Sequence, residues 1–79
     1  MTDQEILAGL AEIIDEVAGV PADDVSPEKN FVEDLDIDSL SMVEIAVAAQ
    51  DKFGVEIPDE QLKDLKTVQD VITYVSKNV

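Results

Sequence analysis

The sequence predicts an all-α protein, a small bundle of three main helices plus one short helix, with a long loop between the first and second helices. Apolar residues recur at helical spacing in three separate segments. Glycine and proline separate these segments, with Gly19 after the first and Gly54 and Pro58 after the second. A chain of 79 residues has room for only one packed core. We therefore expect residues 1–79 to form a single domain.

The first predicted helix follows Thr2, which forms a capping-box pattern with Glu5. It ends at Gly19, and its apolar residues are spaced for one buried face. These residues are Ile6, Leu10, Ile13, Ile14 and Val17.

Residues 19–38 lose this spacing and are expected to form a loop. Two prolines, Pro21 and Pro27, and several turn-forming residues oppose any regular element there. Loops of this length are uncommon in compact domains and are often functional. We expect three apolar residues to hold the loop against the core, namely Phe31, Leu35 and Ile37.

The second predicted helix, from about Ser39 to Phe53, has two apolar faces and ends at Gly54. At about 100° per residue, one face is an ordinary core stripe. It consists of Met42, Ile45, Ala46, Ala49 and Phe53. The opposite face consists of Leu40, Val43, Glu44, Val47 and Asp51. Because this second face cannot meet the same core, its pattern favours a docking strip for an apolar and basic partner over chance exposure.

The last two helices are expected to be shorter. Val55–Ile57 should be extended because a proline follows it. Asp59 is expected to cap a short third helix that runs to about Asp64, and Leu62 and Leu65 should face inward. Thr67 and Asp70 should open the fourth helix. Its buried stripe is expected to be Val68, Val71, Ile72 and Val75.

Composition excludes several classes of function. Nineteen acidic and five basic residues give a formal net charge of -14, which repels nucleic acid and anionic membranes and attracts basic protein surfaces. Cysteine and histidine are absent, which excludes disulfides, a thiol nucleophile, the usual zinc sites and a histidine base. Neither a secretion signal nor a membrane-spanning apolar run is present. We expect a cytoplasmic protein with no nucleic-acid partner and no stable membrane association.

Ser39 stands out in the segment DLDIDSLSMVE, at the start of the second predicted helix. A nucleophilic serine needs a base and an oxyanion hole, and the chain has no histidine and no Gly-x-Ser-x-Gly turn, so no catalytic residue is predicted. Asp34, Asp36 and Asp38 match the first three ligand positions of an EF-hand loop. However, Ser39 replaces the required glycine and Ile45 replaces the final glutamate. No metal site is predicted, although loose divalent binding by these acids stays open.

Two structural roles for Ser39 are compatible with the local pattern. Asp38 or Ser39 can cap the second helix by accepting a hydrogen bond from a free backbone N–H. Capping does not exclude modification, because a hydroxyl at a helix start lies near the positive end of the dipole. A phosphodiester on Ser39 would be favoured there by about 0.3–1 kcal/mol.

Three segments resemble the acyl carrier proteins of dissociated (type II) fatty acid synthesis, most closely the actinobacterial branch. They are DSLSMVE, which contains Asp38, Ser39 and Leu40, then FGVEIPDE and TVQDVITYV. The resemblance covers essentially the whole chain without large gaps. Its specificity comes from the place of the Asp-Ser-Leu triplet, after a long loop and ahead of a two-faced helix.

The resemblance implies that Ser39 receives phosphopantetheine from coenzyme A through a phosphopantetheinyl transferase, within the motif completed by Asp38 and Leu40. The thiol of the arm would carry acyl groups as thioesters, which accounts for a chain without cysteine. The protein would be a carrier and not an enzyme, and a monomer suits such a shuttle. The implied partners are the malonyl transferase, ketoacyl synthases, ketoreductase, dehydratase and enoyl reductase of fatty acid synthesis.

The resemblance also implies roles for surface and core residues. The exposed face of the second helix would dock partners, with a second acidic contact at Glu56, Asp59 and Glu60. The acyl chain would enter between the helices, and the lining residues expected are Phe31, Ile57, Leu62, Leu65 and Val71. Ser41 and Gln50 stand where many members carry acids, so partners should rely more on the aliphatic strip.

Two alternatives stay open. A carrier protein of a polyketide synthase, or of peptide assembly, would share the attachment chemistry of Ser39 and differ in its partners. A module of another class would be an acidic interaction protein, such as a metal buffer or an inhibitor of a basic enzyme, in which Ser39 only caps a helix.

Overall fold

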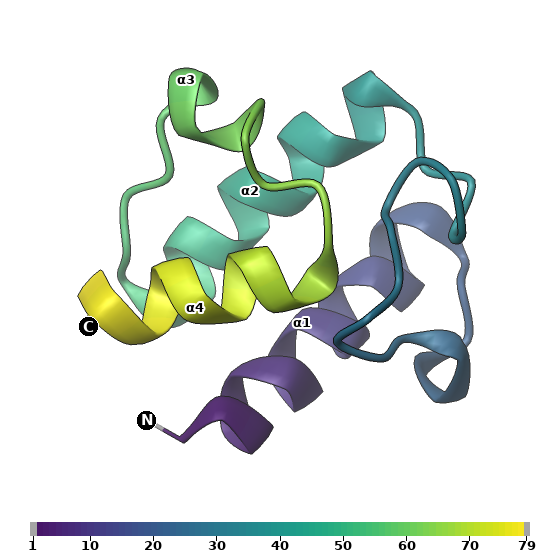
Figure 1. Cartoon of the computed structure of the whole chain (residues 1–79), viewed down its shortest axis with the longest axis horizontal. Helices are drawn as coiled ribbons and strands as arrows, with labels where there is room; N and C mark the ends of the chain where they lie inside the picture. The colour runs from purple at the N-terminus through teal and green to yellow at the C-terminus, as the bar shows by residue number, and fades with distance from the viewer. Residues whose placement is uncertain (1, 79) are drawn as a thin grey trace.

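The computed structural model, which describes residues 2–78, is a bundle of helices around one core (Figure 1). The helices are α1 (Asp3–Ala18), α2 (Ser39–Phe53), α3 (Asp59–Leu62) and α4 (Val68–Asn78), with one 3₁₀ turn, η1 (Ala22–Asp24). α1 packs against both α2 and α4, and α3 packs against α2. Residues 2–78 contain no strand, only one isolated bridge between Asn30 and Thr67. The predicted all-α fold, with three main helices and one short one, is confirmed.

The core is aliphatic, with two phenylalanines, and no polar or charged side chain is buried among residues 2–78. Full burial of each large apolar side chain stabilises the fold by about 1.5–3 kcal/mol. The most deeply buried large side chains come from α1, α4 and the long loop: Ile6, Leu10, Ile14, Phe31, Val68, Ile72 and Val75. The predicted core faces of α2 and α4 are also buried in full. Helical spacing therefore predicted the inward faces of α2 and α4 correctly, whereas Val17 of the predicted α1 face is only partly buried.

Side chains close the N-termini of the main helices as the sequence predicts. Thr2 and Glu5 form a reciprocal capping box: the backbone N–H of Glu5 donates to the Thr2 hydroxyl and that of Thr2 donates to the Glu5 carboxylate, each at 3.2 Å. These bonds lower the pKa of the Glu5 carboxyl, the bond from the Thr2 backbone most of all. Thr67 and Asp70 make the same reciprocal pair at the start of α4, at 3.1 and 3.2 Å. Each pair satisfies backbone donors that have no partner within the helix.

Glycine ends α1 and α2. Gly19 and Gly54 have φ values of 71° and 69°, in the left-handed region that only glycine adopts without strain. Their N–H groups donate to Asp15 and Gln50 at 2.9 Å, which closes the last turn of each helix. The predicted ends of both helices are confirmed.

The third helix differs from the prediction at both ends. Asp59 was expected to cap it, but Asp59 is its first helical residue, and Pro58 is the capping residue without a side-chain bond. The ring of Pro58 fixes its φ at -64°, and its ψ is 151°, so the chain is already extended at the capping position. The Pro58 carbonyl then accepts hydrogen bonds from the N–H groups of Gln61 and Leu62, both at 3.0 Å. The helix stops at Leu62, and the residues to Asp64 form a turn.

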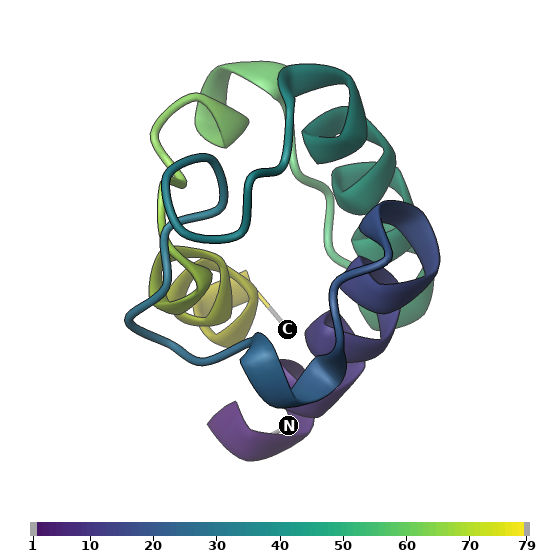
Figure 2. The same cartoon turned by 90° about the vertical axis from the view of Figure 1, so that its right-hand side faces the viewer.

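The long loop is more ordered than its composition suggests. It was expected to lack regular elements, yet Ala22–Asp24 form a 3₁₀ turn directly after a proline. Figure 2 shows the loop passing beside α4 before it returns to the start of α2. Three backbone bonds fasten it there: Phe31 N–H to Lys66 O at 3.0 Å, Val68 N–H to Lys29 O at 3.0 Å, and Gln69 N–H to Pro27 O at 2.9 Å. Phe31, Leu35 and Ile37 are buried, which confirms that they hold the loop against the core.

α1 and α2 approach each other closely at Gly9. A Cβ atom added there would lie 2.9 Å from Cζ of Phe53 and 2.9 Å from Cε of Lys52. The Lys52 ammonium also pairs with Glu12 at 3.6 Å across the same two helices. Because the Lys52 and Glu12 side chains are largely exposed, this ion pair adds little stability. The close approach of α1 and α2 therefore depends on the small size of Gly9.

No helix among residues 2–78 combines the length and the apolarity that crossing a membrane requires.

Candidate functional site

Ser39 is the first residue of α2, and its side chain is exposed. Asp38 is the capping residue: its carboxylate Oδ1 accepts a hydrogen bond from the Ser41 backbone N–H at 2.8 Å. Of the two residues that could have capped the helix, Asp38 therefore does so. The Ser39 hydroxyl is left without a structural role among residues 2–78, at the positive end of the helix dipole.

Hydrogen bonding keeps the capping carboxylate charged. The bond from the Ser41 backbone N–H lowers the pKa of Asp38, and the Ser41 hydroxyl lowers it further. Both groups favour the ionised form of the carboxyl, so Asp38 carries a negative charge beside Ser39 at neutral pH.

The segment before α2 fixes the position of Ser39. Asp36 adopts a left-handed conformation with φ of 56°, which aspartate tolerates better than most residues. The chain then turns so that Ile37 is buried, and the Ile37 N–H donates to the Phe31 carbonyl at 2.9 Å. An anchored residue therefore lies two positions before Ser39.

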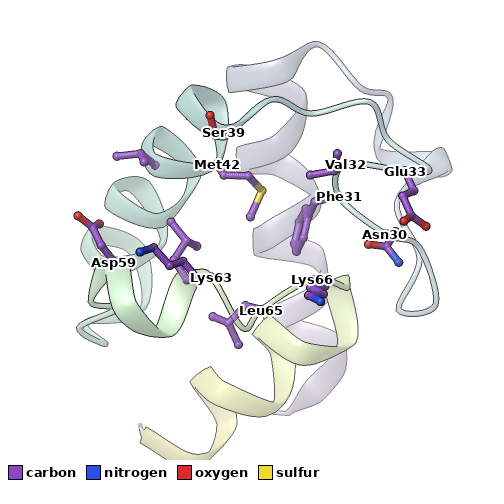
Figure 3. A pocket seen from close by; sticks show the side chains of 12 residues that line it. Asn30, Phe31, Val32, Glu33, Ser39, Met42, Asp59, Lys63, Leu65 and Lys66 are labelled. Carbon is purple, nitrogen blue, oxygen red and sulfur yellow. The ribbon is translucent and has the colours of Figure 1, made fainter.

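An apolar groove opens beside Ser39, with a volume of about 580 Å³ (Figure 3). The loop, the start of α2 and the segment from α3 to α4 supply its walls. Its apolar lining residues are Phe31, Val32, Met42, Val43, Leu62 and Leu65. Asn30, Glu33, Ser39, Asp59, Lys63 and Lys66 complete the lining. In Figure 3 the Met42 side chain reaches from α2 toward Phe31 of the loop.

The groove brings together three of the five residues expected to line an acyl path, namely Phe31, Leu62 and Leu65. Ile57 and Val71 are buried in the core and do not line it. Sequence reasoning missed Met42 as a lining residue because it was assigned only to the core stripe. Sequence reasoning also missed Val32 as a lining residue. The sequence feature that could have indicated it is an apolar residue close to three acids in a loop.

The outward face of α2 is exposed along its length. The exposed fractions of Leu40, Val43 and Val47 are 70%, 42% and 59%. The two acids of this face are also exposed, as are those expected as a second acidic contact: Glu44, Asp51, Glu56, Asp59 and Glu60. Ser41 and Gln50 are only half-buried at the edges of this face. Aliphatic side chains of this size in one row, surrounded by acids, form a surface that suits an apolar partner with a basic rim.

This arrangement is suited to holding an attached group. The free Ser39 hydroxyl can form an ester, the helix N-terminus favours a negatively charged phosphodiester there, and the groove can accept an apolar chain. The residues present therefore fit a phosphopantetheine arm that carries an acyl group. Among residues 2–78 no three acidic side chains are arranged to hold a metal ion.

Comparison with known proteins supports the same assignment. The family model described as "Phosphopantetheine attachment site" matches residues 8–75. The chain is 82% identical over 76 residues to the acyl carrier protein of Thermobifida fusca, covering 96% of each protein. It is 62% identical over 76 residues to the acyl carrier protein of Acidothermus cellulolyticus, covering 96% of this chain and 90% of that protein.

A third relative bears a more specific name. The chain is 64% identical over 76 residues to the meromycolate extension acyl carrier protein of Mycolicibacterium smegmatis, covering 96% of this chain and 77% of that protein. These matches confirm the resemblance seen in the sequence motifs. The chain belongs to the acyl carrier proteins, which carry acyl groups on a covalently attached phosphopantetheine.

Proposed function

We propose that Ser39 is the attachment point of the phosphopantetheine, and that residues 1–79 act as a single carrier domain in fatty acid synthesis. The observation that carries this proposal is the position of Ser39. Its hydroxyl is exposed at the start of α2, is freed from capping by Asp38, and lies on the rim of the apolar groove. Three other serines, Ser26, Ser41 and Ser76, do not line the groove.

The chemistry divides between the arm and the chain. When bound, the arm supplies a thiol that holds the acyl group as a thioester. The chain supplies the Ser39 oxygen for the phosphodiester, and the N-terminus of α2 favours its negative charge by about 0.3–1 kcal/mol. The chain itself catalyses no reaction in this account.

The groove is the proposed resting place of the acyl chain. Phe31, Leu62 and Leu65 line it together with Met42, and the opening beside Ser39 lets a chain enter from the attachment point. Each methylene moved from water into such a site is favourable by about 0.8 kcal/mol at full burial. Seating the chain would also keep part of it away from water between enzymatic steps.

The outward face of α2 is the proposed docking site for partner enzymes. Leu40, Val43 and Val47 would form its apolar centre, with Glu44 and Asp51 beside them. A second contact would involve the exposed acids at and before α3: Glu56, Asp59 and Glu60. A net charge of -14 attracts basic surfaces over a long range, whereas a small contact releases quickly, and a shuttle needs both properties.

The proposed partners are the phosphopantetheinyl transferase, the malonyl transferase, ketoacyl synthases, ketoreductase, dehydratase and enoyl reductase of fatty acid synthesis, which would place the protein in the cytoplasm. The relatives at 82% and 62% identity, which are named simply acyl carrier proteins, support a carrier of acyl chains. The relatives named meromycolate extension acyl carrier proteins support a second pathway, meromycolate extension. The test is to load the protein with a malonyl transferase and then to add the extension enzymes of fatty acid synthesis. Extension would support a role in fatty acid synthesis, and failure of extension would count against that role.

The attachment site can be tested by mass. The unmodified protein is incubated with coenzyme A and a competent phosphopantetheinyl transferase, and its mass is measured before and after. We expect a gain of one phosphopantetheine for the wild type and for Ser41→Ala, and no gain for Ser39→Ala. A modified Ser39→Ala protein would contradict the assignment of Ser39. An unmodified wild type would favour a non-carrier acidic module.

A further inference from the structure

Val32 is an exposed apolar residue that the docking strip of α2 does not include. Its exposed fraction is 61%, close to those of Leu40 and Val47. Among residues 2–78 the exposed large hydrophobic side chains are Val32, Leu40, Val43 and Val47, so Val32 is the member of this group outside α2. Its neighbours Glu33 and Asp34 are exposed acids.

Val32 is presented by a hydrogen-bonded turn. The Asn30 carbonyl accepts the N–H groups of both Asp34 and Leu35 at 3.0 Å. In return, the Asp34 carboxylate accepts the Asn30 N–H at 2.7 Å. Phe31 before Val32 and Leu35 after it are both buried, so the turn is fixed on both sides while Val32 points to solvent. A side chain held outward in this way loses little conformational freedom when a partner covers it.

The groove lies between Val32 and the exposed face of α2, and Ser39 is one of its lining residues. Val32, Ser39 and Val43 line the same groove, Val32 from the loop and the other two from α2. Figure 3 shows Ser39 on α2, and Val32 on the loop beside Phe31, with Met42 lying between the two elements. Apolar side chains from both the loop and the helix therefore line the groove that Ser39 borders.

We propose that Val32 is a contact for the enzyme that modifies Ser39, a phosphopantetheinyl transferase with an apolar patch and a basic rim. This inference rests on the proposed function, in which Ser39 is that enzyme's substrate. The transferase must bring its reacting group to within bonding distance of the Ser39 oxygen, so its surface has to cover the residues around Ser39. Val32 on one side and Leu40 and Val43 on the other then make apolar contacts, and Glu33 and Asp34 attract the basic rim.

Enzymes that act on the far end of the arm have a weaker requirement. Their reacting atoms meet the thiol or thioester, so their contacts with the protein can lie farther along α2, toward Val47. The proposal therefore makes Val32 selective for attachment over later steps.

The test compares rates of attachment to apo protein. The variants are Val32→Ser, Val32→Ile as a matched apolar control, and Val43→Ser as a variant of the α2 strip. We expect Val32→Ser to lower kcat/KM of the transferase by about three- to tenfold, and Val32→Ile to stay near wild type. Because apo protein carries no acyl chain, a change in cargo seating cannot produce this loss. Should Val32→Ser fail to fold, Val32→Thr replaces one methyl by a hydroxyl at unchanged shape and takes its place.

A second assay uses the holo forms of the same proteins with a malonyl transferase. In this assay we expect kcat/KM for Val32→Ser to be within about twofold of the wild-type value. An equal loss in both assays would overturn the selectivity for attachment. Wild-type kcat/KM for Val32→Ser, with a clear loss for Val43→Ser, would overturn the contact at Val32 and leave the proposed function intact. A wild type that accepts no phosphopantetheine would overturn both.

Discussion

Seating of the acyl chain in the groove should make the stability of the loaded protein depend on chain length. The change to make is in the cargo: holo protein is compared with its butanoyl and octanoyl thioesters. The two acyl forms differ by four methylenes, and full burial of each contributes about 0.8 kcal/mol, which gives an upper value of about 3 kcal/mol. Because Leu62 is only partly buried and the groove opens beside exposed Ser39, we expect about half of this value or more.

The assay is urea unfolding of each form, with the free energy of unfolding obtained by linear extrapolation. A gain of about 1.5–3 kcal/mol from butanoyl to octanoyl is the expected result. Leu62→Trp is the control, because its larger side chain should occupy the groove and reduce the dependence on chain length. If the butanoyl and octanoyl forms unfold at the same urea concentration, the acyl chain stays outside the groove and this reasoning is wrong.

Three further predictions concern packing, capping and charge. Gly9→Ala should lower the free energy of unfolding by about 1 kcal/mol, because crowding of the added methyl against Phe53 at 2.9 Å should outweigh the gain in helix propensity. Urea unfolding measures this change, and a variant more stable than wild type would contradict it. The lowered pKa of Asp38 means that its contribution to stability is present above its ordinary value of 3.8 and is lost as pH falls through the folded-state value. Asp38→Asn keeps a capping side chain that does not titrate. The stability of wild type relative to this variant should therefore fall on acidification, as thermal unfolding at several pH values would show. A Tm difference between the two proteins that stays constant with pH would refute the lowered pKa of Asp38. Finally, a net charge of -14 predicts that added salt raises Tm while it weakens docking to a partner synthase, and insensitivity of either to salt would count against the electrostatic account.

Helical spacing and capping residues predicted the three main helices closely. Thr2, Gly19 and Gly54 mark boundaries through chemistry that acts within one turn, so the sequence carries the whole signal. The third helix was less accurately predicted. The Pro58 backbone caps this helix, which a search for capping side chains overlooks. The cap was therefore predicted one residue too late, at Asp59 instead of Pro58.

The loop and the groove could not be predicted in the same way. The loop is ordered by backbone bonds from Phe31 to Lys66 and from Val68 to Lys29, and such long-range pairs leave no periodic trace in the sequence. The groove depends on how the loop, α2 and α3 meet. Its residues Val32 and Met42 therefore became apparent only in the structure, whereas the exposed face of α2 followed from helical periodicity alone.

The left-handed conformation of Asp36 also escaped the sequence analysis. The acids of residues 34–38 were compared with a calcium loop, yet in the structure they serve backbone roles. Asp34 closes the turn at Asn30, Asp36 turns the chain, and Asp38 caps α2. Short polar side chains can bond to nearby backbone groups, so alternating acids can indicate a built turn as readily as a metal site.

The most direct measurement of the central claim is peptide mapping by mass spectrometry of protein treated with coenzyme A and a phosphopantetheinyl transferase. The account predicts one phosphopantetheine per chain, located on Ser39, with none on Ser41 and none in Ser39→Ala. Attachment at another residue, or a wild type that stays unmodified while a known carrier is modified by the same enzyme, would contradict it.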